Sequence, residues 1–394
     1  MDVAKKNVAV LAVCQGLLFV NNSVLITVNA LAGIALAPNK ALATLPVTMY
    51  FVGSALTTVP LSFMMKRHGR RAGFTLGAVF AVLGSLICAA AVYAASFWLL
   101  CLGVLVLGGY FAAGQYYRFA AADSAPADFR ATAISLVLAG GIVGGFVGPE
   151  TSKRTIDLLA GHLYAAAYFS LVGFALLTVL VLRWLTIPVL TETERMSAGR
   201  PLAEIARQPA FIVALLCAMI AYGVMNLLMT TTPLAMIACE HPFSDAAFVI
   251  QWHIVGMFAP SFVTGTLIRR FGLSTVMLAG VALNVGCVVT ALSGVDVMNF
   301  WLAMLLLGIG WNFMFIGATA LLTESHTPAE RAKVQGVNDA AIFVTMVASS
   351  LSSGALFTLQ GWDAMNRWAL PVLAVAGAAV LWLVWVRRQA PRAT

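Results

Sequence analysis

Two stretches in the second half of the chain place soft metal ligands one helical turn apart. Each stretch contains two such side chains separated by four residues, a spacing that puts both on one face of a helix. The pairs are Met225 with Met229 and His253 with Met257. Thioethers and imidazoles are ligands that suit Cu(I), and thioethers carry no charge at any relevant pH. The pattern therefore predicts a site that binds a copper ion with moderate strength, as a protein that must also release the ion would need.

The two pairs are also matched in depth. The short connection at 237–246 makes the two helices antiparallel neighbours. Two residues that face each other at equal depth, one on each helix, therefore have numbers that add up to the same sum. Met229 with His253 and Met225 with Met257 give the same total. Met236 continues the face of Met225 and Met229. Methionine also fills gaps in apolar packing, but an imidazole within a membrane span favours a function.

Composition places these helices in a lipid bilayer. The 394 residues are 61% hydrophobic and 10% charged, and the mean hydropathy is +0.94, which excludes a soluble surface. Stretches long enough to cross about 30 Å of hydrocarbon as helices recur along the whole chain. We predict twelve transmembrane helices, at about 8–33, 41–63, 72–92, 97–119, 131–150, 163–185, 209–236, 246–267, 273–294, 299–321, 336–358 and 366–387. The predicted fold is an all-α polytopic membrane protein.

Positive charge indicates the orientation. Most of the 23 lysines and arginines fall at the termini and in every second connection between the predicted helices. By the positive-inside rule, both termini and these connections are cytoplasmic. The net charge of +8 follows from this bias and needs no nucleic-acid partner.

The second half of the chain repeats the first. KRHG at 66–69 returns as RRFG at 269–272, and DSAPADFR at 123–130 returns as ESHTPAER at 324–331. Both elements follow an even-numbered predicted helix, so the two halves have the same orientation in the membrane.

The repeat predicts two bundles of six helices. They comprise residues 1–185 and 209–394, and the polar, proline-containing segment 186–208 forms a cytoplasmic linker between them. Parallel repeats of this kind, with a substrate site between them, are typical of secondary transporters that work by alternating access.

One loop carries a family signature. SFMMKRHGRRAG at 62–73 resembles the signature G-x-L-x-D-R-x-G-R-R of the major facilitator superfamily. The matching residues are Arg67, Gly69, Arg70 and Arg71. The degenerate second copy, GTLIRRFG, matches at Gly265, Arg270 and Gly272. The resemblance implies the major facilitator fold and a gating role for this loop, although Lys66 replaces the acidic residue of the signature.

The four metal ligands extend the resemblance to one branch. M-x-x-x-M on the seventh helix followed by H-x-x-x-M on the eighth is similar to the CcoA-type copper importers of bacteria. This resemblance implies Cu(I) import across the inner membrane for cytochrome c oxidase assembly, with copper chaperones as candidate partners. It also implies that Cys217 and Cys239 are an accessory thiol pair, with Cys239 and Met236 at the entry.

A second function stays open. The same branch contains riboflavin transporters, in which aromatic and amide side chains would form the pocket and the methionines would line it. The sequence has no phosphate-binding loop and no nucleophile–base arrangement, so we expect neither an enzyme nor a cofactor. The lipid bilayer and the transported solute are the expected partners.

Further polar residues lie within the predicted spans. Gln115, Tyr116, Tyr117 and Arg118 end the fourth helix, and we expect Arg118 to pair with a carboxylate such as Asp123. A polar network between helices is predicted for Asn226, Asn312, Asn338 and Asp339.

Overall fold

The computed structural model describes residues 3–39, 42, 45–187 and 191–389. In this part of the chain, eleven helices are long and apolar enough to cross a membrane, and a bent pair of helices makes the twelfth span. The twelve-span, all-helical prediction is confirmed.

The spans follow one another along the chain with short connections. They are α1 (Val3–Leu36), α2 (Leu45–His68), α3 (Arg70–Tyr93), α4 (Phe97–Gln115) continued by α5 (Tyr117–Asp123), α6 (Arg130–Ala139) continued by α7 (Ile142–Thr155), α8 (Ala165–Val181), α11 (Pro209–Ala238), α12 (Phe243–Phe258) with α13 (Ser261–Phe271), α14 (Leu273–Leu292), α15 (Val297–Leu322) and α16 (Arg331–Gln389). Short helices lie between them: η2 (Ala127–Phe129), η3 (Leu182–Trp184), α9 (Glu192–Met196) and α10 (Leu202–Ile205). α16 contains two spans, Arg331–Ser353 and Leu356–Gln389, and has a kink at Gly361, whose φ is 77°.

The eighth span differs from the predicted straight helix. It bends by 41° between Ser244–Phe258 and Ser261–Phe271. Pro260 lies at the bend, and proline cannot donate the backbone hydrogen bond that would continue the helix. The Nδ2 group of Asn312, on α15, donates to the carbonyl oxygen of Met257 at 2.6 Å and so satisfies a polar group at the break. Such compensation is required where a helix is interrupted at membrane depth.

The chain forms two compact units. Unit 1 comprises Met1–Pro126, Leu136–Ser197 and Arg331–Val347, and unit 2 comprises Ala127–Ser135, Ala198–Glu330 and Ala348–Thr394. The short segments Ala127–Ser135 and Arg331–Val347 each begin within the repeated sequence element of their half, and each belongs to the unit formed mainly by the other half. The predicted boundaries at 185 and 209 stay a prediction.

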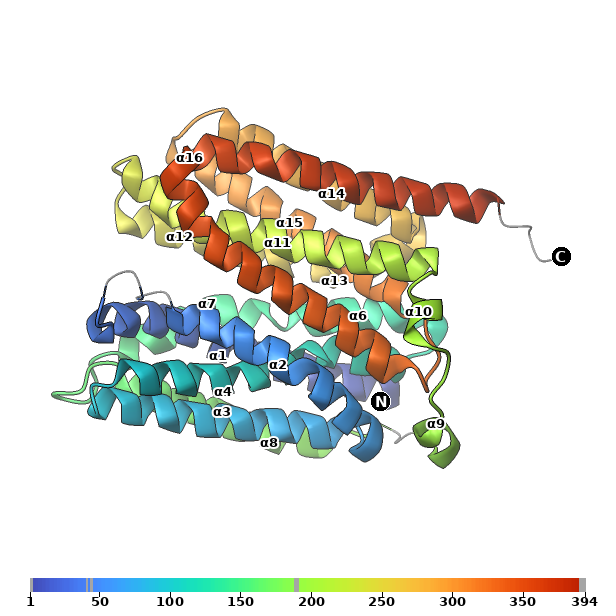
Figure 1. The fold of residues 1–394 in the computed structure, drawn as a ribbon, viewed down its shortest axis with the longest axis horizontal. Coiled ribbons are helices and arrows are strands. Elements are labelled where there is room, and N and C mark those ends of the chain that lie inside the picture. The colour runs from blue at the N-terminus through green and yellow to red at the C-terminus, as the bar shows by residue number, and fades with distance from the viewer. Residues whose placement is uncertain (1–2, 40–41, 43–44, 188–190, 390–394) are drawn as a thin grey trace. The chain divides into compact units, whose positions relative to one another are not determined.

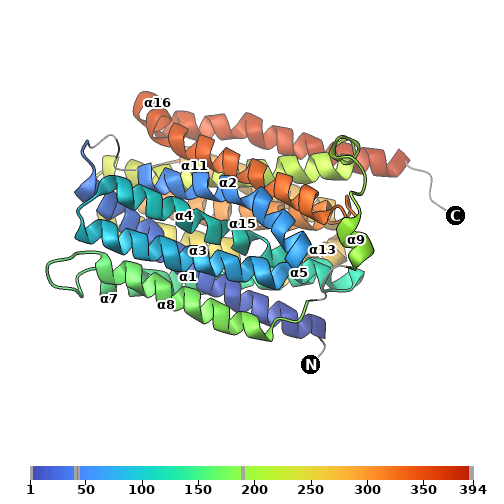
Figure 2. The same cartoon turned by 60° about the horizontal axis from the view of Figure 1, so that its bottom comes forward.

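In unit 1, α2, α3 and α4 pack closely, and α3 also lies beside α8 (Figure 2). Glycines permit the contact between α2 and α4. A Cβ atom on Gly53 would lie 1.9 Å from the carbonyl oxygen of Leu105, and one on Gly108 would lie 2.3 Å from that of Tyr50. The Oγ of Ser54 donates across this contact to the Gly108 carbonyl at 2.9 Å. Small residues allow this approach, as is typical of membrane helices.

In unit 2, α15 is the central helix. α11, α12 and α14 all pack along it, and α11 and α14 can be seen beside it in Figure 1. α15 is correspondingly buried, and Trp311 and Phe315 near its middle have no exposed surface. The side chains of the neighbouring helices are therefore positioned mainly by their contacts with α15.

The glycine contact of unit 1 yields a stability prediction. Gly108→Ala should destabilise the protein by about 1–3 kcal/mol, because a methyl group must displace the backbone of α2. Gly173→Ala, on an open face of α8 with no atom within 4 Å of the new Cβ, is the matched control and should be neutral or stabilising. Thermal unfolding in detergent measures both, and equal melting temperatures for the two variants would contradict the close contact.

Candidate functional site

The predicted copper ligands lie on α11 and α12 of unit 2. His253 is completely buried, and its Nδ1 atom lies 2.8 Å from the carbonyl oxygen of Met304 on α15. Its Nε2 atom has no hydrogen-bond partner among the described residues. Met225, Met257 and Met236 are buried, whereas Met229 is half-buried.

The face of α12 that carries His253 and Met257 packs on α15. A Cβ atom on Gly308 of α15 would lie 2.6 Å from the carbonyl oxygen of His253 and 2.8 Å from the backbone nitrogen of Met257. Met304 also contacts α11, because the Oγ1 of Thr232 donates to its sulfur at 3.2 Å. α11 and α12 are therefore linked here through α15. Convergence of the four predicted ligands stays a prediction, and no cluster of three His, Cys, Asp or Glu residues suited to a metal occurs in the described part of the chain.

The two cysteines of the predicted thiol pair lie near opposite ends of α11. Cys217 is buried, with its sulfur 4.0 Å from the carbonyl oxygen of Ala376. Cys239 is exposed at the end of the helix and lines a mostly apolar hollow together with Trp362 and Asp363. Because α11 is continuous between the cysteines, they are too far apart to act on one ligand directly.

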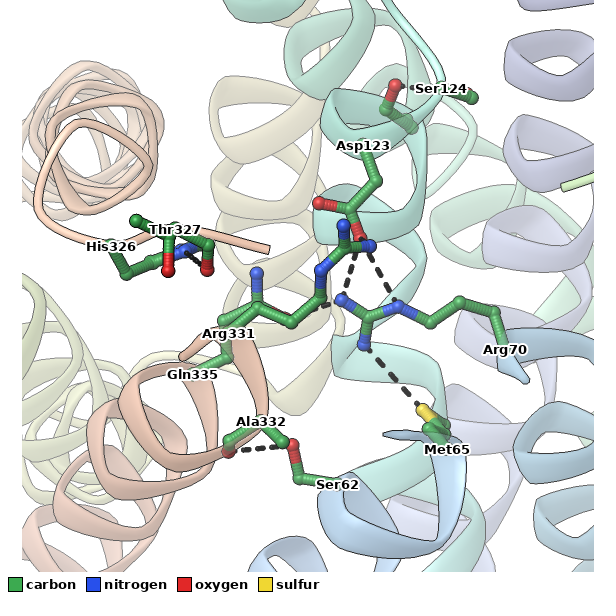
Figure 3. Close-up of polar contacts among 11 residues, drawn as sticks. Ser62, Met65, Arg70, Asp123, Ser124, His326, Thr327, Arg331, Ala332 and Gln335 are labelled. Carbon is green, nitrogen blue, oxygen red and sulfur yellow. Dashed lines mark hydrogen bonds and ion pairs between the residues drawn. The ribbon is translucent and has the colours of Figure 1, made fainter. Parts of the chain in front are cut away.

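The signature loop contributes one buried arginine to an ion-pair cluster within unit 1. Arg70 donates from Nη2 to Asp123 at 2.8 Å, and Arg331 donates to the same carboxylate oxygen at 2.9 Å (Figure 3). Arg70 also donates to Oε1 of Gln335 at 2.6 Å. The Oγ of Ser62 donates to the carbonyl oxygen of Ala332 at 2.9 Å. Asp123, which ends α5, thus supplies the negative charge that joins α3 to the first turns of α16.

The other signature residues are more exposed. Lys66, at the acidic position of the signature, donates from Nζ to the carbonyl oxygen of Ser197 at 2.7 Å, so it contacts the linker and not a carboxylate. Arg67 and Arg71 point to solvent, as does Arg270 of the second copy. The glycines of the two copies, Gly69 and Gly272, both have φ of 87°, a value that glycine adopts without strain. The repeat is therefore preserved in the backbone.

Arg118 pairs with a different carboxylate from the one expected. Its Nη2 atom donates to Oδ1 of Asp339 on α16 at 2.5 Å, and both side chains are buried. Its Nη1 atom donates to the backbone oxygen of Gln115 at 2.6 Å and to Oε1 of Gln115 at 2.7 Å. The predicted pairing with Asp123 is wrong because a residue five positions along a helix points about 140° away.

Buried aromatic rings flank these polar groups in unit 1. Phe111, one turn before Gln115, stacks on Tyr50 with ring centroids 5.2 Å apart. Phe343, one turn after Asp339, lies 5.7 Å from Phe111. This pairing of α4 and α16 was not predicted from the sequence, although Phe111 with Gln115 and Asp339 with Phe343 are each four residues apart. Together, these side chains place flat apolar faces beside amide and carboxylate groups.

Unit 2 contains its own aromatic cluster. Tyr222 of α11 meets Trp311 and Phe315 of α15 edge to face, with centroids 5.3 Å and 4.9 Å away. Phe258, at the end of α12, lies 6.0 Å from Trp311. Clusters of this type bind flat ring systems by stacking and edge contacts.

The ion-pair cluster yields a second prediction. Asp123→Asn leaves Arg70 and Arg331 without their shared counter-charge, so we expect a loss of about 3–5 kcal/mol of stability. Glu150→Gln removes an exposed pair with Arg154 and should leave the stability nearly unchanged, because solvent screens such a pair. Chemical denaturation in detergent measures the stability of both variants. If Asp123→Asn leaves the stability unchanged, solvent already screens the charges of the cluster.

Comparison with known proteins overturns the copper hypothesis. The chain is 41% identical over 374 residues to the riboflavin transporter RfnT of Brucella anthropi, and the match covers 94% of each chain. A relative this similar along its whole length favours an organic solute, so copper import as the main function is wrong. Neither the CcoA resemblance nor copper chaperones as partners are supported. The four-residue pattern led to a wrong prediction for two reasons. Methionine is also a common packing residue, and His253 bonds to a backbone carbonyl oxygen of α15.

The remaining comparisons agree on the fold. Two uncharacterised MFS-type transporters of Bacillus subtilis, YddS and YdeG, are 29% and 30% identical and cover 90% and 86% of the chain. Among solved structures, the outward conformation of FucP superposes with a TM-score of 0.73 at 16% identity, covering 95% of this chain and 98% of that one. Human MFSD10 gives a TM-score of 0.78 at 13% identity, covering 96% and 99%.

The sequence model of the Major Facilitator Superfamily matches residues 11–311 and 215–394. Proteins of this superfamily are carriers, which agrees with the expectation that the chain is not an enzyme. With the family model, whole-length relatives and the twelve-span architecture in agreement, the chain belongs to the Major Facilitator Superfamily.

Proposed function

We propose that this protein transports riboflavin, or a closely similar flavin, across the bacterial inner membrane by alternating access. The whole-length identity of 41% to the riboflavin transporter RfnT carries the proposal. Riboflavin has a flat three-ring system, an imide edge with one donor and two acceptors, and a chain of hydroxyl groups. It therefore needs aromatic faces and neutral polar partners.

Unit 1 offers both kinds of group. Phe111 supplies an aromatic face, and the neighbouring rings of Tyr50 and Phe343 enlarge it. Gln115 follows Phe111 by one turn, and its Nε2 donor has no hydrogen-bond partner among the described residues. We assign these side chains to flavin binding. Side chains that are buried this deeply must move apart to admit the solute, as alternating access requires.

In unit 2, the earlier candidates keep a role as pocket lining. Met225, Met229 and Met257 are adaptable apolar side chains, and His253 has an unpartnered Nε2 atom that can accept a hydrogen bond. In this role none of the four is a metal ligand, so a flavin carrier should tolerate His253→Leu far better than a copper carrier would.

We propose the orientation with both termini in the cytoplasm. The lysine and arginine bias of the sequence supports it. In this orientation the signature loop, with Arg67, Gly69, Arg70 and Arg71, acts at the cytoplasmic ends of the helices, and Arg270 and Gly272 occupy the equivalent place in the second half. Cys239 then lies at the periplasmic end of α11.

Flavin transport is tested by uptake. Cells that cannot make or import riboflavin should accumulate labelled riboflavin and grow at low riboflavin when they express this protein. Phe111→Ala should reduce uptake about tenfold, because stacking on one aromatic ring is worth roughly 1–3 kcal/mol. Phe169→Ala, on the exposed face of α8, is the matched control and should leave uptake unchanged at equal membrane abundance. Uptake equal to that of cells without the protein would refute the function.

The orientation is tested by the one exposed thiol among the cysteines. The other five are buried, so an impermeant maleimide should label only Cys239. We expect labelling in spheroplasts and none in sealed inside-out vesicles, and Cys239→Ser should abolish it. Labelling confined to the inside-out vesicles would reverse the proposed topology.

A further inference from the structure

Asn21 of α1 is a buried amide whose two polar atoms both lack a hydrogen-bond partner. The residue is 4% exposed, and neither Nδ2 nor Oδ1 is bonded to another group among the described residues. Asn29, about two turns further along the same helix, shows the usual arrangement, because its Oδ1 accepts from the hydroxyl of Tyr168 at 2.7 Å. A buried polar group without a partner costs stability. The amide of Asn21 therefore points to a partner that comes from outside the chain.

Two contacts place Asn21 at the depth of Phe111. Gly114 of α4 lies against Leu18 of α1, since a Cβ atom on Gly114 would lie 2.2 Å from Cδ2 of Leu18. The rings of Phe19 and Phe111 meet edge to face, with centroids 6.5 Å apart. Residue numbers therefore rise along α1 as they fall along α4, and one turn beyond Leu18 corresponds to one turn before Gly114. Asn21 shares the face of Leu18 and so lies level with Phe111.

Gln115 supplies a further donor on the face of α4 that carries Phe111. Arg118 donates to Oε1 of Gln115 at 2.7 Å, and this bond fixes the direction of the amide, because a guanidinium has no acceptor. Nε2 is therefore the end of the amide that is left, and it has no partner among the described residues. Unit 1 thus presents one unpartnered acceptor and two unpartnered donors close to the Phe111 ring.

These three atoms match the imide edge of a flavin. That edge has one donor, N3–H, between two carbonyl oxygens. Oδ1 of Asn21 is an acceptor, whereas Nδ2 of Asn21 and Nε2 of Gln115 are donors. The ring system of the flavin would stack on Phe111. Phe19 brings α1 to the rim of the Phe111 ring, where the edge of a stacked ring system emerges.

We propose that Asn21 recognises the imide edge of the solute, with Gln115 as the second donor. Oδ1 of Asn21 accepts from N3–H, and Nδ2 of Asn21 and Nε2 of Gln115 donate to the two carbonyl oxygens. This inference rests on the proposed flavin transport and names the part of the solute that the carrier selects. Flavins with a free imide fit this site, and flavins substituted at N3 do not.

Discrimination against a flavin methylated at N3 tests the proposal. The wild type should bind riboflavin about tenfold or more tightly than 3-methylriboflavin, because the methyl group removes the donor that Oδ1 of Asn21 needs. Asn21→Ala should bind both compounds equally, since it removes the acceptor and leaves room for the methyl group. Asn39→Ala, the same substitution at an exposed asparagine beyond α1, should discriminate as the wild type does. Quenching of flavin fluorescence by the purified protein in detergent measures the affinities.

Two results would overturn the imide assignment while riboflavin transport stands. Equal affinity of the wild type for the two flavins would show that N3–H has no partner in the protein. A preference for riboflavin that persists in Asn21→Ala would show that another group binds N3–H or excludes the methyl group. If the wild type neither binds nor carries riboflavin, the proposed function is wrong and the imide assignment falls with it.

Thermal unfolding in detergent gives an independent readout. Asn21→Leu replaces an unpartnered amide by an apolar side chain of similar size, so without solute it should melt at the temperature of the wild type or above it. Riboflavin should raise the melting temperature of the wild type more than that of Asn21→Leu at the same concentration. Asn29→Leu, which breaks the bond to Tyr168, should melt at a lower temperature. If Asn21→Leu melts as low as Asn29→Leu, Asn21 supports the fold and the proposal is wrong.

Discussion

A lipid bilayer offers no hydrogen-bond partner to the backbone, and this constraint governs the structure at every level. It explains why the chain is helical throughout its described spans and why the sharply bent eighth span needs a side chain at its break. There, Asn312 donates to the carbonyl oxygen of Met257 beside Pro260. The same constraint explains the glycine contacts, since helices in lipid associate through close packing and polar bonds between helices more than through hydrophobicity.

Charge inside the helical units follows the same rule. Arginines within unit 1 pair with carboxylates from other spans: Arg70 and Arg331 share Asp123, and Arg118 pairs with Asp339. Near the linker, Glu330 receives bonds from Arg200 and from the backbone at Thr327. Hydrogen bonding to Arg200 is the main cause that lowers the pKa of Glu330 below its ordinary value, so this pair stays ionised at neutral pH. The repeated sequence element of the second half thus ends in consecutive residues that belong to different units, Glu330 in unit 2 and Arg331 in unit 1.

The copper hypothesis failed for a physical reason. A pattern of methionine and histidine at helical spacing is compatible with a ligand set and with packing, and spacing alone does not distinguish the two. In the structure His253 engages Met304 of α15, and Met257 lies against Gly308 of the same helix. The residues more relevant to a flat organic solute, Phe111 and Phe343, are ordinary apolar residues in sequence. They stand out only once α4 and α16 are seen together.

The sequence by itself determined the local properties of this protein. Hydropathy determined the spans, glycine determined the turns at Gly69 and Gly272, and the loop signature identified the family. These features depend on a few adjacent residues and on the surrounding lipid. The partners of charged side chains depended on the tertiary structure. Arg118 and Asp339 are 221 residues apart, and the nearby Asp123 was the more natural choice from sequence. Only the packing of α16 against α4 and α5 decides that pairing, because direction around a helix and contact between distant spans are not encoded in any single stretch of the chain.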